Sequence, residues 1–227
     1  MPRKRYRPLV DIPISASKDR LSILLERVRG KTVLDLGCSG TKLGISHFRY
    51  QYLHHALAKE AGEILGVDID EHAVAAMKAA GFNVQAANAE TMNLGRRFQV
   101  IIAGDIIEHL PNPGLFLKNM RDHLEEDGEL LITTPNPFKF KQILKILKYN
   151  QVKVHAEHTC WICPTVLKRL LEISGLKMTH LFWIRDPEWY RPSQWPALIR
   201  PYWSPSFLSV AKKGPAPSLP DPLQEVL

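Results

Sequence analysis

The sequence predicts an α/β fold, with a doubly wound, mostly parallel sheet and helices on both of its faces. Short apolar runs alternate along the chain with segments of helical periodicity. Each apolar run is nearly continuous, so the strand that it forms has no polar face and must be covered on both sides. The 227 residues are enough for one such domain with a sizeable core.

The first half of the chain carries four of the expected strands. A helix is expected over residues 15–30, with Ser15 or Ser17 as its N-cap and Gly30 as its end. The elements that follow are a strand at 31–37, a helix at 45–62, a strand at 63–70, a helix at 71–81, and strands at 82–90 and 96–105.

The second half adds three strands, which makes seven. The expected elements are a helix at 112–128, a strand at 129–136, a basic amphipathic stretch at 139–150, a helix at 164–176, and strands at 177–185 and 206–213. The segment 186–203, rich in tryptophan and proline, has no assignment. Residues 213–227 are expected to form a proline-rich disordered tail.

Composition narrows the class of protein. Three cysteines, Cys38, Cys160 and Cys163, are too few for a disulfide framework. No apolar run approaches the roughly 18 residues of a membrane span. The basic start "MPRKRYRPLVDIP" lacks the apolar stretch of a secretory signal, so a cytoplasmic protein is expected. The net charge of +7 is compatible with binding to a nucleic acid, an anionic substrate or a membrane surface. It is equally compatible with a charge that only keeps the protein soluble.

A glycine-containing turn follows the strand at 31–37, in the stretch "VLDLGCSG". Gly37 lets a ligand approach the backbone there, because a Cβ atom would obstruct it. The dinucleotide-binding pattern G-x-G-x-x-G is not matched, since its third glycine would fall at Lys42. The turn therefore gives little support to a pyrophosphate site.

Polar residues recur at the carboxyl ends of four successive strands. Asp35 lies inside the first of them, Asp68 ends the second, residues 88–90 (Asn-Ala-Glu) end the third, and Asp105 ends the fourth. A carboxylate placed as Asp68 is can accept both hydroxyls of a ribose, while Asp70 is expected to cap the next helix. Four such positions at one sheet edge indicate a single ligand site.

These stretches resemble the class I S-adenosylmethionine (SAM)-dependent methyltransferases. The resemblance covers residues 31–176, in family order, through the motifs "VLDLGCSG", "GVDID", "NAE", "AGDIIEHLPNP", "DGELLITTPNP" and "EHTCWICPTVLKRLLEISGL". It implies a Rossmann-like methyltransferase sheet, SAM as cofactor and S-adenosylhomocysteine as product. The last three motifs resemble a branch of small methyltransferases associated with polysaccharide, lipid or other small-molecule modification.

The resemblance also assigns cofactor-binding residues. Ribose binding falls to Asp68, adenine packing to Ile69, and the flanks of the adenine and its amino group to Ala89 and Glu90. The methionine part would be lined by Asp35, Gly37, Cys38 and Ser39, with Asp105 near its end. Ser39 and Thr41 depart from the family, because many members have glycine there. The implied domain spans residues 1–212, with a cofactor half at about 15–135 and an acceptor or cap half at 136–212.

Three residues are candidates for the chemistry. A hydroxyl acceptor must lose its proton, which suits a histidine or carboxylate near the methyl group. Glu108 and His109 follow the fourth strand at the right place, and an imidazole has the right pKa range for a base. His158, with Trp161, is expected in the acceptor pocket or its lid. Alternatively, His109 only caps or packs the turn before Pro111.

Two metal sites have to be considered. The residues His155, His158, Cys160 and Cys163 look like zinc ligands, but their gaps leave little chain to wrap an ion, so no metal is expected. The second set resembles the metal site of small-RNA 2′-O-methyltransferases. In that reading Mg²⁺ or Mn²⁺ would be held against a ribose hydroxyl by Asp105, Glu108, His109 and His158.

The sequence thus favours methyl transfer from SAM to the hydroxyl of a small molecule: a glycan, a lipid-linked compound or a metabolite. The alternatives are metal-assisted methylation of an RNA ribose and a catalytically silent SAM-binding subunit. The basic stretch 139–150 is either a cap over the acceptor site or an amphipathic surface for a membrane or partner. The tryptophans Trp183, Trp189, Trp195 and Trp203 either stack on an acceptor or cover the sheet.

Overall fold

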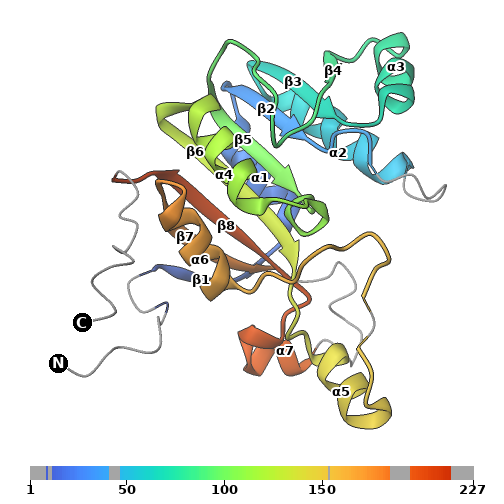
Figure 1. Cartoon of the computed structure of the whole chain (residues 1–227), viewed down its shortest axis with the longest axis vertical. Coiled ribbons are helices and arrows are strands. Elements are labelled where there is room, and N and C mark those ends of the chain that lie inside the picture. Colours follow the sequence, from blue (N-terminus) through green and yellow to red (C-terminus); the bar gives the residue numbers. More distant parts are fainter. Residues whose placement is uncertain (1–8, 10–11, 41–46, 153, 185–194, 216–227) are drawn as a thin grey trace, which may run out of the picture.

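Eight strands form one sheet in the order β1-β7-β8-β6-β5-β2-β3-β4 (Figure 1). The computed structural model describes residues 9, 12–40, 47–152, 154–184 and 195–215. All neighbouring strands are parallel except β8, which is antiparallel to β6 and β7. The strands are β1 (Ile14–Lys18), β2 (Thr32–Leu36), β3 (Glu63–Asp68), β4 (Val84–Ala86), β5 (Phe98–Gly104), β6 (Leu124–Pro135), β7 (Leu176–Ile184) and β8 (Ser206–Lys213). The predicted doubly wound sheet is confirmed, with one strand more than the seven expected.

The additional strand is β1. The prediction that the first helix begins at residue 15 was therefore wrong. Ile14 pairs with Leu181 of β7, so β1 covers what would otherwise be an exposed sheet edge. Helix α1 (Arg20–Val28) begins later, and Asp19 is its N-cap, with a carboxylate that accepts the Ser22 N–H at 3.2 Å. The prediction of Ser15 or Ser17 as the cap was therefore wrong. Strand pairing with distant residues outweighed the local helix signal.

The boundary between α4 (Pro113–His123) and β6 also differs from the prediction. The helix was expected to run to residue 128, but the chain becomes extended at Leu124, which pairs with Phe98 of β5. Leu124 is fully buried. Burying this leucine in the sheet outweighs the helical tendency of the polar residues that follow it.

Helices cover both faces of the sheet. On one face α1 and α2 (His47–Glu60) pack over the sheet, and on the other face α4 and α6 (Pro164–Ile173) do so. Helix α3 (Glu71–Ala79) packs beside β4 at one end of the sheet. Helices α5 (Phe140–Tyr149) and α7 (Trp195–Ile199) lie together beyond the sheet, at the opposite end of the molecule (Figure 1).

Strand order reverses between β2 and β5, the neighbouring strands from which the chain winds outward in both directions. In sheets of this kind ligands bind outside the carboxyl ends of the strands at such a point. The fold therefore brings the ends of β2 to β5 together, as the sequence predicted. Predictions for Thr41, Lys42, Trp189 and residues beyond 215 lie outside the described residues. Within the described chain, no helix has both the length and the apolar character that a membrane span requires.

Candidate functional site

The turn after β2 is held in a conformation that only glycine adopts easily. Gly37 and Gly40 have φ angles of +70° and +76°. The Gly37 N–H donates to the Val67 carbonyl oxygen of β3 at 2.8 Å, which anchors the turn to the neighbouring strand. A Cβ at Gly37 would come only to within 3.7 Å of Ile106, an ordinary contact, so backbone conformation rather than crowding requires the glycine.

The main cavity, of about 400 Å³, lies at the carboxyl ends of β2 to β5. Seven of the predicted cofactor-binding and catalytic residues line it, namely Gly37, Asp68, Ile69, Ala89, Glu90, Asp105 and His109. The residues Asp35, Cys38 and Ser39, which were expected at the methionine part, are not among its lining residues.

Ser39 orients Asp68 from behind. Its Oγ donates to Asp68 Oδ2 at 2.7 Å and its N–H donates to the same oxygen at 3.1 Å, while Oδ1 accepts the Asp70 N–H at 3.0 Å. A carboxylate oxygen can accept about two hydrogen bonds, so Oδ1 keeps one site for a ribose hydroxyl. Oδ2 can take a second hydroxyl only if the Ser39 hydroxyl turns away from it, toward the Gly40 carbonyl oxygen at 3.3 Å. Asp70 also caps α3 through the N–H groups of His72 and Ala73, which confirms the predicted cap.

Ile69 is 67% exposed beside this carboxylate and forms an apolar part of the cavity wall. An exposed isoleucine next to a fixed aspartate suits a ligand that joins an apolar ring to a sugar. The sequence predicted Asp68 at a ribose and Ile69 at an adenine, and both residues line this cavity.

Asp35 and Cys38 belong to the packing beneath the turn. Asp35 is 3% exposed, and its Oδ2 lies 2.8 Å from Nδ1 of His54, which α2 contributes and which is fully buried. The Cys38 Sγ packs so closely on Gly66 that a Cβ there would lie 2.7 Å from the sulfur. Burial, with Asp35 and Asp68 nearby, raises the pKa of the Cys38 thiol far above its ordinary value, so this thiol is neutral.

The buried pair yields a stability prediction. Replacing His54 with alanine leaves the Asp35 carboxylate buried without its partner, which costs about 3–5 kcal/mol. We expect His54→Ala to lower the melting temperature by roughly 10 °C, measured by calorimetry. His72→Ala, at an exposed histidine of α3, is the control and should stay near the parent value. A loss of less than 1 kcal/mol in His54→Ala would contradict this role for the pair.

The loop at residues 88–90 is pinned against α4. Glu90 is buried, and its Oε1 accepts the Asn112 N–H at 2.6 Å at the start of α4. Asn88 Oδ1 accepts the Glu90 N–H at 2.8 Å, and Asn119 Nδ2 donates to the Ala89 carbonyl oxygen at 3.0 Å. Glu90 is therefore a buried part of the wall and not a solvated loop residue. Helix α4 fixes the loop that forms this side of the cavity.

Asp105 is held by contacts from two other elements. Its φ angle is +51°, its Oδ1 accepts the Thr133 hydroxyl at 3.0 Å, and its Oδ2 lies 2.5 Å from Nη1 of Arg20. Arg20 was not predicted as part of this site, because nothing in its local sequence connects it to a residue 85 positions away. An ion pair from α1 thus holds Asp105 in place at the β5 end of the cavity.

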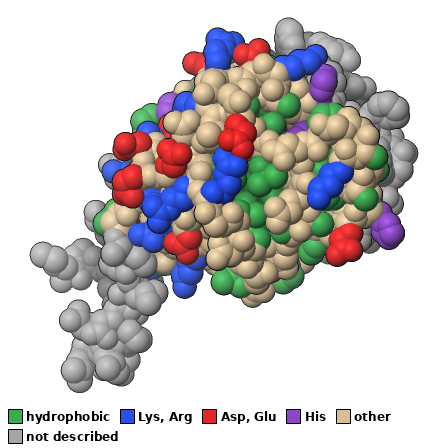
Figure 2. Space-filling model, turned by 90° about the horizontal axis from the view of Figure 1, so that it is seen from above, with side chains coloured by type: hydrophobic (Ala, Val, Ile, Leu, Met, Phe, Trp, Pro, Cys, Tyr) green, Lys and Arg blue, Asp and Glu red, His purple; other side chains and the backbone are tan. Residues whose placement is uncertain are grey.

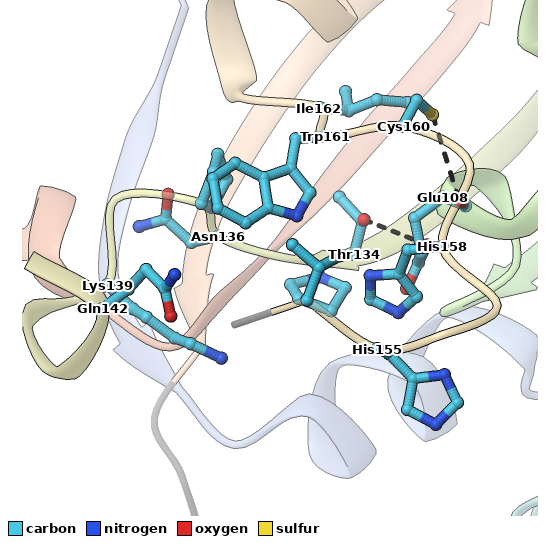
Figure 3. Close-up of a pocket in the computed structure, with 13 residues that line it drawn as sticks. Glu108, Thr134, Asn136, Lys139, Gln142, His155, His158, Cys160, Trp161 and Ile162 are labelled. Carbon is cyan, nitrogen blue, oxygen red and sulfur yellow. Dashed lines mark hydrogen bonds between the residues drawn. The ribbon is translucent and has the colours of Figure 1, made fainter. Parts of the chain in front are cut away.

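A second cavity of about 140 Å³ adjoins the turn after β5 (Figure 3). Glu108, Thr134 and His158 lie at one end of it, and Lys139 and Gln142 at the other. Its further lining residues are Pro135, Asn136, Pro137, Val154, His155, Cys160, Trp161 and Ile162. The structure thus places His158 and Trp161 in the wall of one small pocket with both polar and apolar side chains.

Glu108 is the one carboxylate among the lining residues of this pocket, and it is buried, at 2% exposure. Its Oε2 accepts the Thr134 hydroxyl at 3.0 Å, whereas Oε1 has no hydrogen-bond partner among the described residues. Burial and the charge of Asp105 raise the pKa of Glu108 to about 8. Gln142 Nε2, in the same wall, is a second buried polar atom without a partner in the described chain.

His109 lies in the wall of the main cavity and beside the second one. Its ring centre is 4.7 Å from that of His158, which lines the second cavity. Nδ1 lies 3.2 Å from the Glu157 carbonyl oxygen. A carbonyl can only accept, so Nδ1 carries the hydrogen and the neutral ring keeps its lone pair at Nε2. Burial and the nearby His109 and His155 lower the pKa of His158, which favours its neutral form.

Three potential metal ligands come together here. The ligand atoms of Glu108, His109 and His158 lie within 4.8 Å of one another, and no other such group occurs among the described residues. Asp105 is outside the group. The set of two histidines and two cysteines is not assembled either, since the Cys160 Sγ faces the Ile107 carbonyl oxygen at 3.8 Å and Cys163 precedes α6.

Trp183 and Trp203 each pack against another aromatic side chain. Trp183 is buried in the core and lies 4.7 Å from Tyr202 between ring centres. The Trp203 ring lies 5.3 Å from that of Phe140, which joins the segment before β8 to α5. The side chains of Trp189 and Trp195 lie outside the described residues.

Comparison with known proteins identifies the family. The family of methyltransferase domains matches residues 11–181. A ubiquinone biosynthesis O-methyltransferase of Coxiella burnetii is 27% identical over 164 residues, which are 66% of this chain and 65% of the relative. The chain thus spans just under two-thirds of that relative's length. A protein of the same name from Leptothrix cholodnii is 25% identical over 225 residues, 92% of this chain and 86% of the relative.

Solved structures show the same fold. A SAM-dependent methyltransferase from Archaeoglobus fulgidus superposes with a TM-score of 0.63 at 20% identity, covering 86% of this chain and 91% of the other. The shared fold, the match over residues 11–181 and the cavity at the strand ends agree. The chain belongs to the class I SAM-dependent methyltransferases, as its motifs predicted.

Proposed function

We propose that the chain methylates a hydroxyl oxygen of a small molecule, a glycan, lipid-linked compound or metabolite, bound in the second cavity. The observation that carries this proposal is the position of His109. It stands in the wall of the cofactor cavity, 4.7 Å between ring centres from His158 in the wall of the second cavity. Relatives named O-methyltransferases support oxygen as the accepting atom.

The residues divide the work of binding. Asp68 would hold the ribose of the cofactor, and Ile69 and the loop at 88–90 would contact its adenine. The turn at Gly37 would contact the methionine part, and Asp105 would lie near the end of that part. The bound cofactor supplies an electrophilic methyl group on a positively charged sulfur with a neutral leaving group. Placing the acceptor in line with that methyl supplies much of the rate enhancement.

The acceptor hydroxyl must also lose its proton, which requires a base near the methyl group. His109 Nε2 would accept this proton as general base while the acceptor oxygen takes the methyl group that the cofactor supplies. His158 and the partnerless Oε1 of Glu108 position the hydroxyl through hydrogen bonds. Because the pKa of Glu108 is about 8, this carboxyl is mostly protonated at pH 7 and can donate as well as accept.

The raised pKa of Glu108 predicts an effect on stability with a definite sign. The folded chain keeps this carboxyl protonated from pH 4.5 up to about 8, whereas the unfolded chain ionises it. The stability contribution is complete below pH 4.5 and is lost as the pH rises to about 8. Glu108→Gln should therefore be more stable than the parent at pH 8, on the order of 2–4 kcal/mol, and nearly equal at pH 4.5.

Urea unfolding at the two pH values measures this difference. Glu26→Gln, at an exposed glutamate of α1, is the control and should show no pH-dependent gain. If Glu108→Gln gave the same difference from the parent at both pH values, the carboxyl would not be protonated in the fold.

Transfer of a tritiated methyl group from SAM into cell extract tests the proposed function. The label is expected in nuclease-resistant small molecules, and it should not appear with heat-denatured protein. Label that nuclease releases would instead support the RNA alternative. No label in any fraction would favour a silent SAM-binding subunit.

A metal-assisted reaction is the second candidate, because Glu108, His109 and His158 bring three ligand atoms within 4.8 Å. In that case these residues would hold Mg²⁺ or Mn²⁺, which lowers the pKa of a bound hydroxyl. Activity that survives dialysis against EDTA supports His109 as the base. Activity lost to EDTA and restored by Mg²⁺ or Mn²⁺ supports the metal.

A further inference from the structure

The segment from residue 136 to 156 is basic throughout. It contains five lysines and no aspartate or glutamate. The remainder of the described chain mixes its charges, and Figure 2 shows acidic and basic side chains side by side at the end of the molecule opposite α5. A one-sided charge of this kind attracts an anionic partner.

Helix α5, in the middle of this segment, leaves its apolar side uncovered. Gln142 is its only buried residue, whereas Leu147 is 77% and Leu144 47% exposed. Phe138, Ile146, Tyr149, Val152 and Val154 are exposed in the same segment. A core helix of a globular domain would bury such side chains. The helix therefore presents an apolar surface to something outside the described chain.

Lysines flank this apolar surface in a regular pattern. Lys141, Lys145 and Lys148 recur at helical spacing and share one side of α5, next to the side of Leu144 and Leu147. No ion pair within the described chain involves these three lysines. Burial and the neighbouring Lys145 and Lys141 lower the pKa of Lys139, as expected where positive charges lack nearby carboxylates.

We infer that α5 and the segment around it dock on an anionic lipid membrane. A short helix with exposed leucine, isoleucine and aromatic side chains beside lysines has the character of an interfacial helix. The lysines would meet lipid headgroups while Leu144 and Leu147 enter the acyl boundary. A second copy of the chain fits less well, because a twofold contact through α5 would bring the same lysines together.

The docking surface adjoins the second cavity. Lys139 and Gln142, at the start of α5, line that cavity, and so do Val154 and His155 after it. A protein docked through α5 would therefore open this cavity near the lipid interface. Resting on the proposed function, this placement favours an acceptor hydroxyl on an amphiphile that partitions into the membrane.

Vesicle co-sedimentation tests the docking without any turnover. Vesicles of phosphatidylcholine with one-quarter phosphatidylglycerol are compared with pure phosphatidylcholine, at about 0.1 M salt where screening is moderate. The protein should bind the anionic vesicles at least tenfold more tightly. The triple variant Lys141→Glu/Lys145→Glu/Lys148→Glu should bind them about 100-fold more weakly, since each lysine near such a surface contributes about 1 kcal/mol.

A matched control separates docking from overall charge. Lys59→Glu/Lys78→Glu/Lys118→Glu makes the same change of charge at exposed lysines on α2, α3 and α4, and should bind within about twofold of the parent. Leu144→Ser/Leu147→Ser should also weaken binding. Equal loss in both triple variants, or no binding to anionic vesicles, overturns the inference. So does a dimer on size-exclusion chromatography that Leu144→Ser/Leu147→Ser dissociates. If no methyl transfer is detected but the protein binds anionic vesicles, the result contradicts the proposed function and leaves the inferred membrane docking in place.

Discussion

Replacing Asp68 with alanine is expected to weaken binding of S-adenosylhomocysteine by about 100-fold or more. The carboxylate that would accept two ribose hydroxyls is fixed by Ser39 and by the Asp70 N–H. Each hydrogen bond to a charged group is worth about 1.5–3 kcal/mol, so losing two costs at least about 3 kcal/mol. Isothermal titration calorimetry measures the dissociation constant directly.

Two further variants make this test specific. Ser39→Ala removes the 2.7 Å hydrogen bond that orients Asp68 without removing the carboxylate, and should weaken binding by only about tenfold. Asp122→Ala, at an exposed position of α4, should leave the affinity unchanged. If Asp68→Ala bound the ligand within threefold of the parent, the ribose would have to lie elsewhere.

Replacing His109 with glutamine is expected to lower kcat by about 10²–10⁴-fold, the usual contribution of a general base. Glutamine can fill the space and hydrogen-bond, but it cannot accept a proton at neutral pH. The dissociation constant for S-adenosylhomocysteine should stay within about threefold. The measurement is the initial rate of labelled methyl transfer, together with calorimetry.

His155→Ala is the matched control for His109. This histidine belongs to the same cluster, with its ring centre 6.0 Å from that of His109, but it does not line the main cavity. Its loss should reduce kcat by less than tenfold. Equal losses in the two variants would indicate that the cluster shapes the pocket without supplying the base.

The fold was largely predictable from the sequence because buried parallel strands carry a strong local signal. Strands β2, β3, β5 and β8 all fall within predicted apolar runs. The wrong predictions concern elements whose boundaries are set by pairing with residues far away in the sequence. Residues 14–18 become a strand only because β7 offers a free edge, and Leu124 leaves α4 only because β5 accepts it.

The candidate site was predictable for those residues that lie at the carboxyl ends of the strands. Asp68 ends β3 and Ile69 follows it, and their place in the cavity agrees with their sequence motif. Contacts between distant segments could not be inferred in the same way. His54 beneath Asp35 and Arg20 beside Asp105 come from helices whose local sequence carries no trace of the partner. The hydrogen bond by which Ser39 orients Asp68 likewise joins two segments that lie 29 positions apart in the sequence.

The melting temperature with and without S-adenosylhomocysteine tests the central claim, that the cavity at the ends of β2 to β5 is the cofactor site. Ligand at 100 times its Kd stabilises the fold by about 2.7 kcal/mol, which should raise the melting temperature by roughly 5–10 °C in the parent and not in Asp68→Ala. No shift in the parent at about millimolar ligand, far above the Kd expected for a cofactor, would contradict the account.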